Sequence, residues 1–184
     1  MLPPGCPRCG APPSAGHGCW PPDAPITATL CGYDYRGPVR AAVVAAKLGG
    51  ARRGWAPLVA PLVERLRRMR MVVDVVTWVT SVPARVRHRG VDHAQVIARE
   101  VAGALDVPAM RLLDVAAGRV HDELYTATLR LPGSDVVLVD DVVTTGATAW
   151  RAGAALREAG AGSVILITLA RAGGHPLGAV RPTR

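Results

Sequence analysis

Short apolar runs alternate along this chain with longer segments in which apolar residues recur at helical spacing. Strands are predicted at 26–35, 72–80, 136–139 and 163–170, and helices at 38–47, 55–69, 92–105 and 147–159. The run 72–80 is rich in β-branched residues, which is typical of a buried parallel strand. Strands that alternate with helices of this length indicate an α/β fold with a parallel sheet and right-handed crossovers. Residues 112–128 show no clear pattern, and no element is predicted there.

The length and composition of the chain fit one such domain with a small addition. Its 184 residues are 49% hydrophobic but only 4% aromatic and include no Phe, so the core must consist of Val, Leu and Ala. We expect a cysteine-rich module at 1–25, the α/β domain at 26–171 and a flexible tail at 172–184. The tryptophans are scattered and are expected in the core or at its boundary: Trp20, Trp55, Trp78 and Trp150.

The segment VVLVDDVVTTGATA (136–149) places an apolar strand before two acids, a turn over 142–146 and a helix that starts at Ala147. In a parallel sheet, ligands bind beyond the carboxyl ends of the strands. Backbone N–H groups at a helix N-terminus bind a phosphate well, and here they belong to Thr144, Thr145, Gly146, Ala147 and Thr148. Asp140 and Asp141 accept hydrogen bonds, so a sugar with free hydroxyls is their natural partner. The segment therefore predicts a site for a phosphorylated ribose.

Two other kinds of nucleotide-binding site also follow an apolar strand, but this chain lacks the sequence motif of each. A P-loop requires G-x-x-x-x-G-K-[ST], whereas the only lysine lies in AAKLG. A dinucleotide fold requires G-x-G-x-x-G after a strand, whereas Gly160 and Gly162 precede one. A strand, tight turn and capped helix without a ligand is the remaining alternative, and it does not account for two adjacent acids beside an anion-attracting turn.

These residues resemble the loop with which type I phosphoribosyltransferases bind 5-phosphoribosyl-1-diphosphate (PRPP). The order of motifs resembles the ComF family: a cysteine module, then YDYRGPVRAAVVAAKLGG, SVPARVRHRG and VLVDDVVTTGAT. The resemblance implies a type I phosphoribosyltransferase (Rossmann-like) fold, a parallel sheet flanked by helices. It also implies that Asp140 and Asp141 bind ribose hydroxyls and that 144–148 surround the 5-phosphate, with Mg²⁺ accompanying PRPP.

Three functions are compatible with this resemblance. ComF proteins are associated with competence, which implies an accessory protein for DNA uptake that handles single-stranded DNA together with other uptake proteins. The alternatives are an active phosphoribosyltransferase with an unidentified acceptor, and a PRPP sensor without turnover. The chain has RGVDH where the family usually has RGFNQ, and no catalytic residue is predicted.

The loop after Thr80 is a candidate site for the diphosphate of PRPP. Backbone amides of Ser81 and Val82 and the guanidinium groups of the loop are suited to that anion, and the arginines are Arg85, Arg87 and Arg89. A basic surface loop or a nucleic-acid contact is the alternative. His88 and His93 are possible general acid–base groups, although a loop histidine is more often simply exposed.

The N-terminal cysteines predict a structural zinc site. Cys6-x-x-Cys9 is half of such a site, Cys19 supplies a third thiolate, and His17 or Cys31 completes it. A metal-free module is the alternative. No signal peptide and no apolar run of membrane-spanning length is visible, so a cytoplasmic protein without membrane insertion is expected. In that reducing compartment, cysteines are more often metal ligands than disulfide partners.

The net charge of +8 favours polyanionic partners or reflects a solvated basic surface. A cluster of arginines at the end of the second predicted helix is a candidate contact for single-stranded DNA, with an ordinary helix end as the alternative: Arg65, Arg67, Arg68 and Arg70. Lys47, on the first predicted helix, matches a lysine of the ComF pattern. A solvated helical lysine is the preferred interpretation of that residue.

Overall fold

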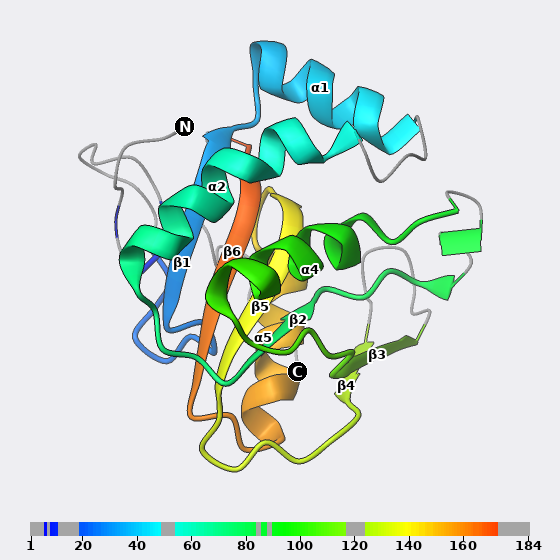
Figure 1. The fold of residues 1–184 in the computed structure, drawn as a ribbon. Helices are drawn as coiled ribbons and strands as arrows, with labels where there is room; N and C mark the ends of the chain where they lie inside the picture. The colour runs from blue at the N-terminus through cyan, green and yellow to red at the C-terminus, as the bar shows by residue number, and fades with distance from the viewer. Residues whose placement is uncertain are drawn as a thin grey trace.

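Four parallel strands form the central sheet in the part of the chain that the computed structural model describes, which comprises residues 6, 8–10, 19–48, 54–83, 86–87, 90–116 and 124–172. The strands lie in the order β1-β6-β5-β2 (Figure 1). Their bounds are Ala28–Asp34 for β1, Val75–Trp78 for β2, Asp135–Val143 for β5 and Ser163–Arg171 for β6. A parallel bridge between Val76 and Ala109 adds a short extension beside β2. The predicted α/β class and parallel pairing are confirmed.

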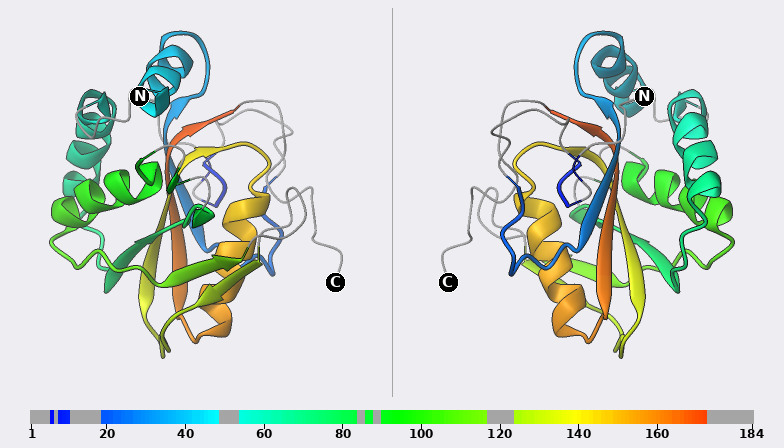
Figure 2. Two further views of the ribbon diagram at one scale, coloured as in Figure 1. Left: turned by 90° about the vertical axis from the view of Figure 1, so that its right-hand side faces the viewer. Right: turned by 90° about the vertical axis from the view of Figure 1, so that its left-hand side faces the viewer.

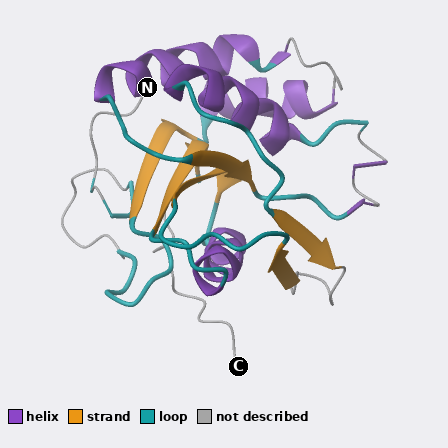
Figure 3. Ribbon diagram, turned by 60° about the horizontal axis from the view of Figure 1, so that its bottom comes forward, coloured by secondary structure: helices purple, strands orange, loops and turns teal. Residues whose placement is uncertain are grey.

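Helices cover both faces of the sheet (Figure 2). Those on one face are α1 (Gly37–Leu48), α2 (Ala56–Met69) and α4 (His93–Leu105), and α5 (Ala147–Glu158) lies on the other, as Figure 3 shows. Alternate residues of β5 pack in the two cores. Val137 and Val139 contact the side of α2 and α4, whereas Val136 and Leu138 contact the side of α5. This alternation follows from the two-residue period of a strand that is buried on both faces.

Two strands differ most in length from their predictions. β2 is shorter than 72–80, whereas β5 is longer than 136–139 and continues to Val143. β5 lies between β2 and β6, and its pairing with β6 extends from Asp135 to Val143. The backbone of both acids therefore belongs to the strand, because ladder pairing overrides the low strand preference of Asp.

The segment without a predicted element contains an antiparallel pair, β3 (Leu113–Ala116) and β4 (Leu124–Ala127). Its side chains are mostly half-buried or exposed, so the apolar pattern that reveals the other strands is weak. The pair lies beside the carboxyl end of β2, and the hydroxyl of Thr80 donates to the carbonyl of Leu113 at 2.9 Å.

The described residues of the N-terminal segment pack against the sheet on the α5 side. Trp20 is fully buried, and its indole Nε1 donates to the hydroxyl of Thr29 at 3.0 Å. Its ring centroid lies 5.8 Å from that of Trp150 on α5. Trp55 and Trp78 are also buried, so the expected core or boundary positions of the tryptophans are confirmed. No described helix has both the length and the apolar character that a membrane crossing requires.

Candidate phosphoribosyl site

The two adjacent acids lie near the carboxyl end of β5. The backbone N–H of Asp141 donates to Asp140 Oδ1 at 2.8 Å, and that of Val142 donates to Asp141 Oδ1 at 2.6 Å. Local hydrogen bonds of this kind hold each carboxylate close to its own backbone. One oxygen of each acid is engaged in this way, which leaves the other oxygen to accept from a ligand or from a neighbouring side chain.

The turn between β5 and α5 covers Thr144 to Gly146, two residues shorter than predicted, because β5 continues further. Gly146 has a φ of +79°, a conformation that a residue without Cβ adopts at little cost, and it occupies the N-cap position of α5. Gly146 has no side chain with which to cap the helix, and the hydroxyl of Thr145 accepts from the backbone N–H of Ala147 at 3.4 Å. The amides of the first turn beyond Ala147 point to this end of the helix, where the helix dipole favours an anion.

A cavity of about 170 Å³ opens between these elements and the end of β2. Its lining combines residues of β5, the segment after β2, three helices and β4: Lys47, Val79, Thr80, Ser81, His93, Ala94, Tyr125, Asp140, Asp141, Val142 and Thr148. The ammonium Nζ of Lys47 lies 2.7 Å from Asp141 Oδ2. The preferred interpretation of Lys47 as a solvated helical residue is therefore wrong, since α1 directs its side chain into the cavity.

The cavity concentrates negative charge. Burial and the neighbouring charge of Asp141 raise the pKa of Asp140 well above its ordinary value, and Lys47 opposes that shift. Such an environment favours groups that donate hydrogen bonds to the acids or neutralise them, such as sugar hydroxyls or a cation.

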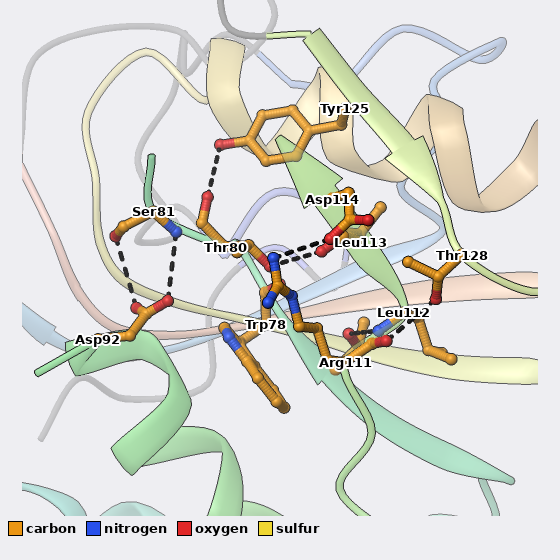
Figure 4. A network of polar contacts seen from close by, with 11 residues as sticks. Trp78, Thr80, Ser81, Asp92, Arg111, Leu112, Leu113, Asp114, Tyr125 and Thr128 are labelled. Carbon is orange, nitrogen blue, oxygen red and sulfur yellow. Dashed lines mark hydrogen bonds and ion pairs between the residues drawn. The ribbon is translucent and has the colours of Figure 1, made fainter. Parts of the chain in front are cut away.

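The predicted diphosphate loop follows β2. Ser81 lines the cavity, whereas Val82, also half-buried, does not, and Arg87 is exposed. Arg85, His88 and Arg89 lie outside the described residues. The backbone N–H of Ser81 donates to Asp92 Oδ2 at 3.2 Å (Figure 4), so this amide is engaged within the protein. Asp92 occupies the predicted N-cap of α4 but makes no side-chain cap. Burial raises its pKa, and hydrogen bonds from Ser81 oppose the shift.

A second cavity, of about 290 Å³, adjoins the first and shares Thr80 and Ser81 with it. Two arginines line it, Arg87 from the loop and Arg111 from the segment before β3. Arg111 also forms an exposed ion pair with Asp114 at 2.8 Å (Figure 4). Arg111 was not predicted as a site residue, because it lies directly before the unpatterned segment 112–128 and outside every predicted element.

Two further residues line the first cavity although the sequence did not predict them there. His93 begins α4, is buried, and packs its ring 5.1 Å from that of Trp55, so the expectation of an exposed loop histidine is wrong. Tyr125 lies on β4, and its hydroxyl donates to the carbonyl of Thr80 at 3.4 Å (Figure 4). A single tyrosine in an unpatterned segment gave no signal of this role.

Three of the predicted zinc ligands come together. The sulfur atoms of Cys6, Cys9 and Cys19 all lie within 4.8 Å of one another, and those of Cys6 and Cys19 are 3.8 Å apart. Two thiolates on one tetrahedral zinc lie roughly 3.8 Å apart, given a Zn–S distance of about 2.3 Å. The cluster is therefore suited to a metal such as zinc. Burial, followed by the two neighbouring thiols, raises the pKa of Cys19 to about 11, and a bound metal ion would oppose this shift by favouring the thiolate.

The two candidates for the fourth zinc ligand are Cys31 and His17. Cys31 is buried in β1, lies outside the group of three, and donates its thiol to the carbonyl of Tyr33 at 3.3 Å. As it stands, Cys31 does not complete the cluster. His17 lies outside the described residues.

The candidate nucleic-acid arginines lie at the predicted end of α2. Arg67, Arg68 and Arg70 are exposed, whereas Arg65 is half-buried. Arg68 pairs with Glu64 of the same helix at 3.0 Å. The exposed part of the cluster is therefore a short cationic edge, separate from the residues that line either cavity.

Comparisons with known proteins assign the chain to a family. A family model described as phosphoribosyl transferase domain matches residues 29–179. A purine phosphoribosyltransferase from Pyrococcus horikoshii is 22% identical, with a TM-score of 0.45 over 65% of this chain and 77% of that one. A hypothetical protein from Neisseria gonorrhoeae with bound ppGpp is 14% identical, with a TM-score of 0.48 over 71% and 74%. The glutamine PRPP amidotransferase of B. subtilis is 25% identical, with a TM-score of 0.41 over 58% and 26%. No curated protein matches significantly.

Proposed function

Because this chain belongs to the phosphoribosyl transferase domain family, we propose that it binds PRPP or a related ribose 5-phosphate at the carboxyl end of β5. One observation carries this proposal. Asp140 and Asp141 line a cavity that also receives Thr148, from the first turn of a helix whose N-cap residue, Gly146, has no side chain. Acceptors for sugar hydroxyls and donors for a phosphate thus lie side by side, as a phosphorylated sugar requires.

The residues of the site have complementary tasks in this proposal. Amides and hydroxyls between Thr144 and Thr148 bind the 5-phosphate, and the two acids orient the ribose by accepting from its hydroxyls. Ser81, held by Asp92, forms the opposite wall. Magnesium prefers oxygen ligands and binds through one or two carboxylates together with substrate phosphates, so Asp140 and Asp141 suit it. When bound, Mg²⁺ would neutralise charge on the diphosphate of PRPP.

Calorimetric titration of the purified protein with PRPP, ribose 5-phosphate and inorganic phosphate in the presence of Mg²⁺ tests this function. We expect both sugar phosphates to bind more tightly than inorganic phosphate. If neither sugar phosphate binds, the proposed function is wrong. Release of diphosphate from PRPP on addition of candidate acceptor bases would identify an active phosphoribosyltransferase. PRPP binding without release would favour the accessory or sensing role.

We further propose a ComF-type role in which the protein handles single-stranded DNA together with DNA-uptake proteins. The exposed arginines Arg67, Arg68 and Arg70 support this role, as does the net charge of +8. The four cysteines are free thiols, which suits a reducing, cytoplasmic compartment.

We also propose that the cysteine cluster holds a structural zinc ion. The sulfur atoms of Cys6 and Cys19 are already separated as zinc ligands require. Next to them, the buried guanidinium of Arg171, at the end of β6, donates to the carbonyl of Cys9 at 3.0 Å. A zinc ion at this position would join the N-terminal segment to the end of β6, with His17 as the candidate fourth ligand.

A further inference from the structure

The ion pair between Lys47 and Asp141 joins two elements that are far apart in the sequence. Lys47 lies in the last turn of α1 and Asp141 near the end of β5, and 2.7 Å separates the two charged atoms. Among the described residues that line this cavity, Lys47 is the only lysine or arginine, whereas two carboxylates face it. A polyanionic ligand needs a cation in this cavity, and Lys47 is placed to supply one.

We propose that Lys47 is a ligand-binding residue that leaves Asp141 when the sugar binds and contacts an anionic group at the anomeric end of the ribose. The inference rests on the proposed function and deepens it. In this proposal, Lys47 distinguishes a ribose phosphate that carries a second anionic group from one that does not.

The two faces of the sheet determine which end of the ligand Lys47 meets. Thr148 enters the cavity from α5, which covers one face, and we propose that it binds the 5-phosphate. Lys47, His93 and Ala94 enter from α1 and α4, which cover the other face (Figure 2). A sugar whose 5-phosphate lies on the α5 side spans the ends of the strands and directs its anomeric carbon toward α1. A diphosphate on that carbon therefore approaches Lys47.

The chemistry of the pair allows this exchange. Ribose hydroxyls donate hydrogen bonds to Asp141, so they replace the ammonium group as its partner. The side chain of Lys47 is partly exposed, at 27%, and the flexible lysine stem permits its ammonium to move between acceptors. In the free protein, Lys47 therefore balances an acid, and in the complex it balances the ligand.

The test compares the affinities of PRPP and ribose 5-phosphate, measured by calorimetry at one fixed Mg²⁺ concentration. Wild type is expected to prefer PRPP. Lys47→Met should reduce PRPP affinity about tenfold or more, the scale of a charge-assisted hydrogen bond, and ribose 5-phosphate affinity much less. Lys47→Arg keeps the charge and should keep most of the preference. Arg40→Met removes an exposed cation from the same helix and should leave both affinities unchanged.

Variants of Asp141 separate a direct contact from an effect transmitted through the acid. Asp141→Asn should weaken both ligands by similar factors and keep the preference for PRPP, because Lys47 remains. If Lys47→Met alone does not fold, the double variant Lys47→Met, Asp141→Asn removes the pair without leaving an unpaired acid. It should lose the preference that Asp141→Asn retains.

The outcomes distinguish the inference from the function on which it rests. If wild type binds neither sugar phosphate, the proposed function fails. If wild type binds both equally well, or if Lys47→Met weakens both by the same factor, the ligand site stands and the role of Lys47 is overturned.

Discussion

The backbone amide of Ser81 donates to the carboxylate of Asp92 at 3.2 Å, which ties the segment after β2 to the first turn of α4. The Ser81 hydroxyl lies 3.5 Å from the other carboxylate oxygen. Both cavities are lined by Ser81, so this pair positions the wall between them. Asp92 is an acid, and burying its charged form costs free energy, so the contact between Ser81 and Asp92 depends on pH.

Asp92→Asn should remove part of the pH dependence of stability. Burial raises the pKa of Asp92 in the folded protein above its ordinary value of 3.8. The folded state therefore binds this proton more tightly than the unfolded state does. Its contribution to stability is fully present below pH 3.8 and is lost as the pH rises through the folded pKa. Urea unfolding at several pH values should show this decline in wild type and a flatter profile in Asp92→Asn. An equally steep profile in the variant would contradict the assignment.

Gly146→Ala should weaken phosphate binding beyond its effect on stability. Gly146 has a φ of +79°, so a side chain there strains the backbone by about 1 kcal/mol. Gly133→Ala is the matched control, because its φ is +71° and its added Cβ meets no atom within 4 Å. Both variants should lose similar unfolding free energy, measured with urea. In calorimetry, only Gly146→Ala should also lose affinity for ribose 5-phosphate; equal affinities would argue against the phosphate site.

Asp140→Asn should weaken the binding of the sugar and spare that of the phosphate. The carboxylate is proposed to accept from a ribose hydroxyl, so its neutralisation should reduce ribose 5-phosphate affinity by about tenfold. Inorganic phosphate makes no such contact and should bind no more weakly than to wild type. Asp114→Asn alters an exposed acid on β3 and serves as the control in the same titrations. Parallel losses for both ligands would show that Asp140 does not bind the sugar.

Cys9→Ser should abolish metal binding and lower the melting temperature. The sulfur of Cys9 belongs to the group of three thiols, whereas that of Cys31 lies outside it. Plasma emission spectrometry should find about one zinc per chain in wild type and in Cys31→Ser, and none in Cys9→Ser. A wild-type zinc content below half an equivalent would exclude the structural zinc site. Chelation should also lower the melting temperature of wild type, because metal affinity contributes to folding.

Arg67→Ala and Arg68→Ala should weaken binding of single-stranded DNA and reduce its dependence on salt. Each cation that contacts a phosphate adds about one to the salt slope, so each variant should lower the slope by that amount. Arg36→Ala is a matched control, because it removes an exposed arginine beyond the end of β1. Fluorescence anisotropy between low and physiological salt measures the slopes. DNA affinity that is unchanged in the double variant would locate the DNA surface elsewhere.

Much of the fold follows from short-range patterns. The elements from β1 to β6 that were predicted begin and end within a few residues of their expected positions, because each carries its own apolar period. The pair of β3 and β4 was missed, since its side chains are mostly exposed or half-buried and its stability depends on contacts with Thr80 and α5.

The candidate site likewise combines residues that are consecutive in the chain with contacts between distant segments. The acids, the turn and the start of α5 are consecutive in the chain, so the sequence by itself determined that donors and acceptors would meet at one loop. Only the tertiary structure decided that Lys47 would pair with Asp141, that Asp92 would hold Ser81, and that His93 would be buried. These contacts join segments that the parallel crossovers bring together. Their formation depends on how helices pack across the sheet, which no local pattern encodes.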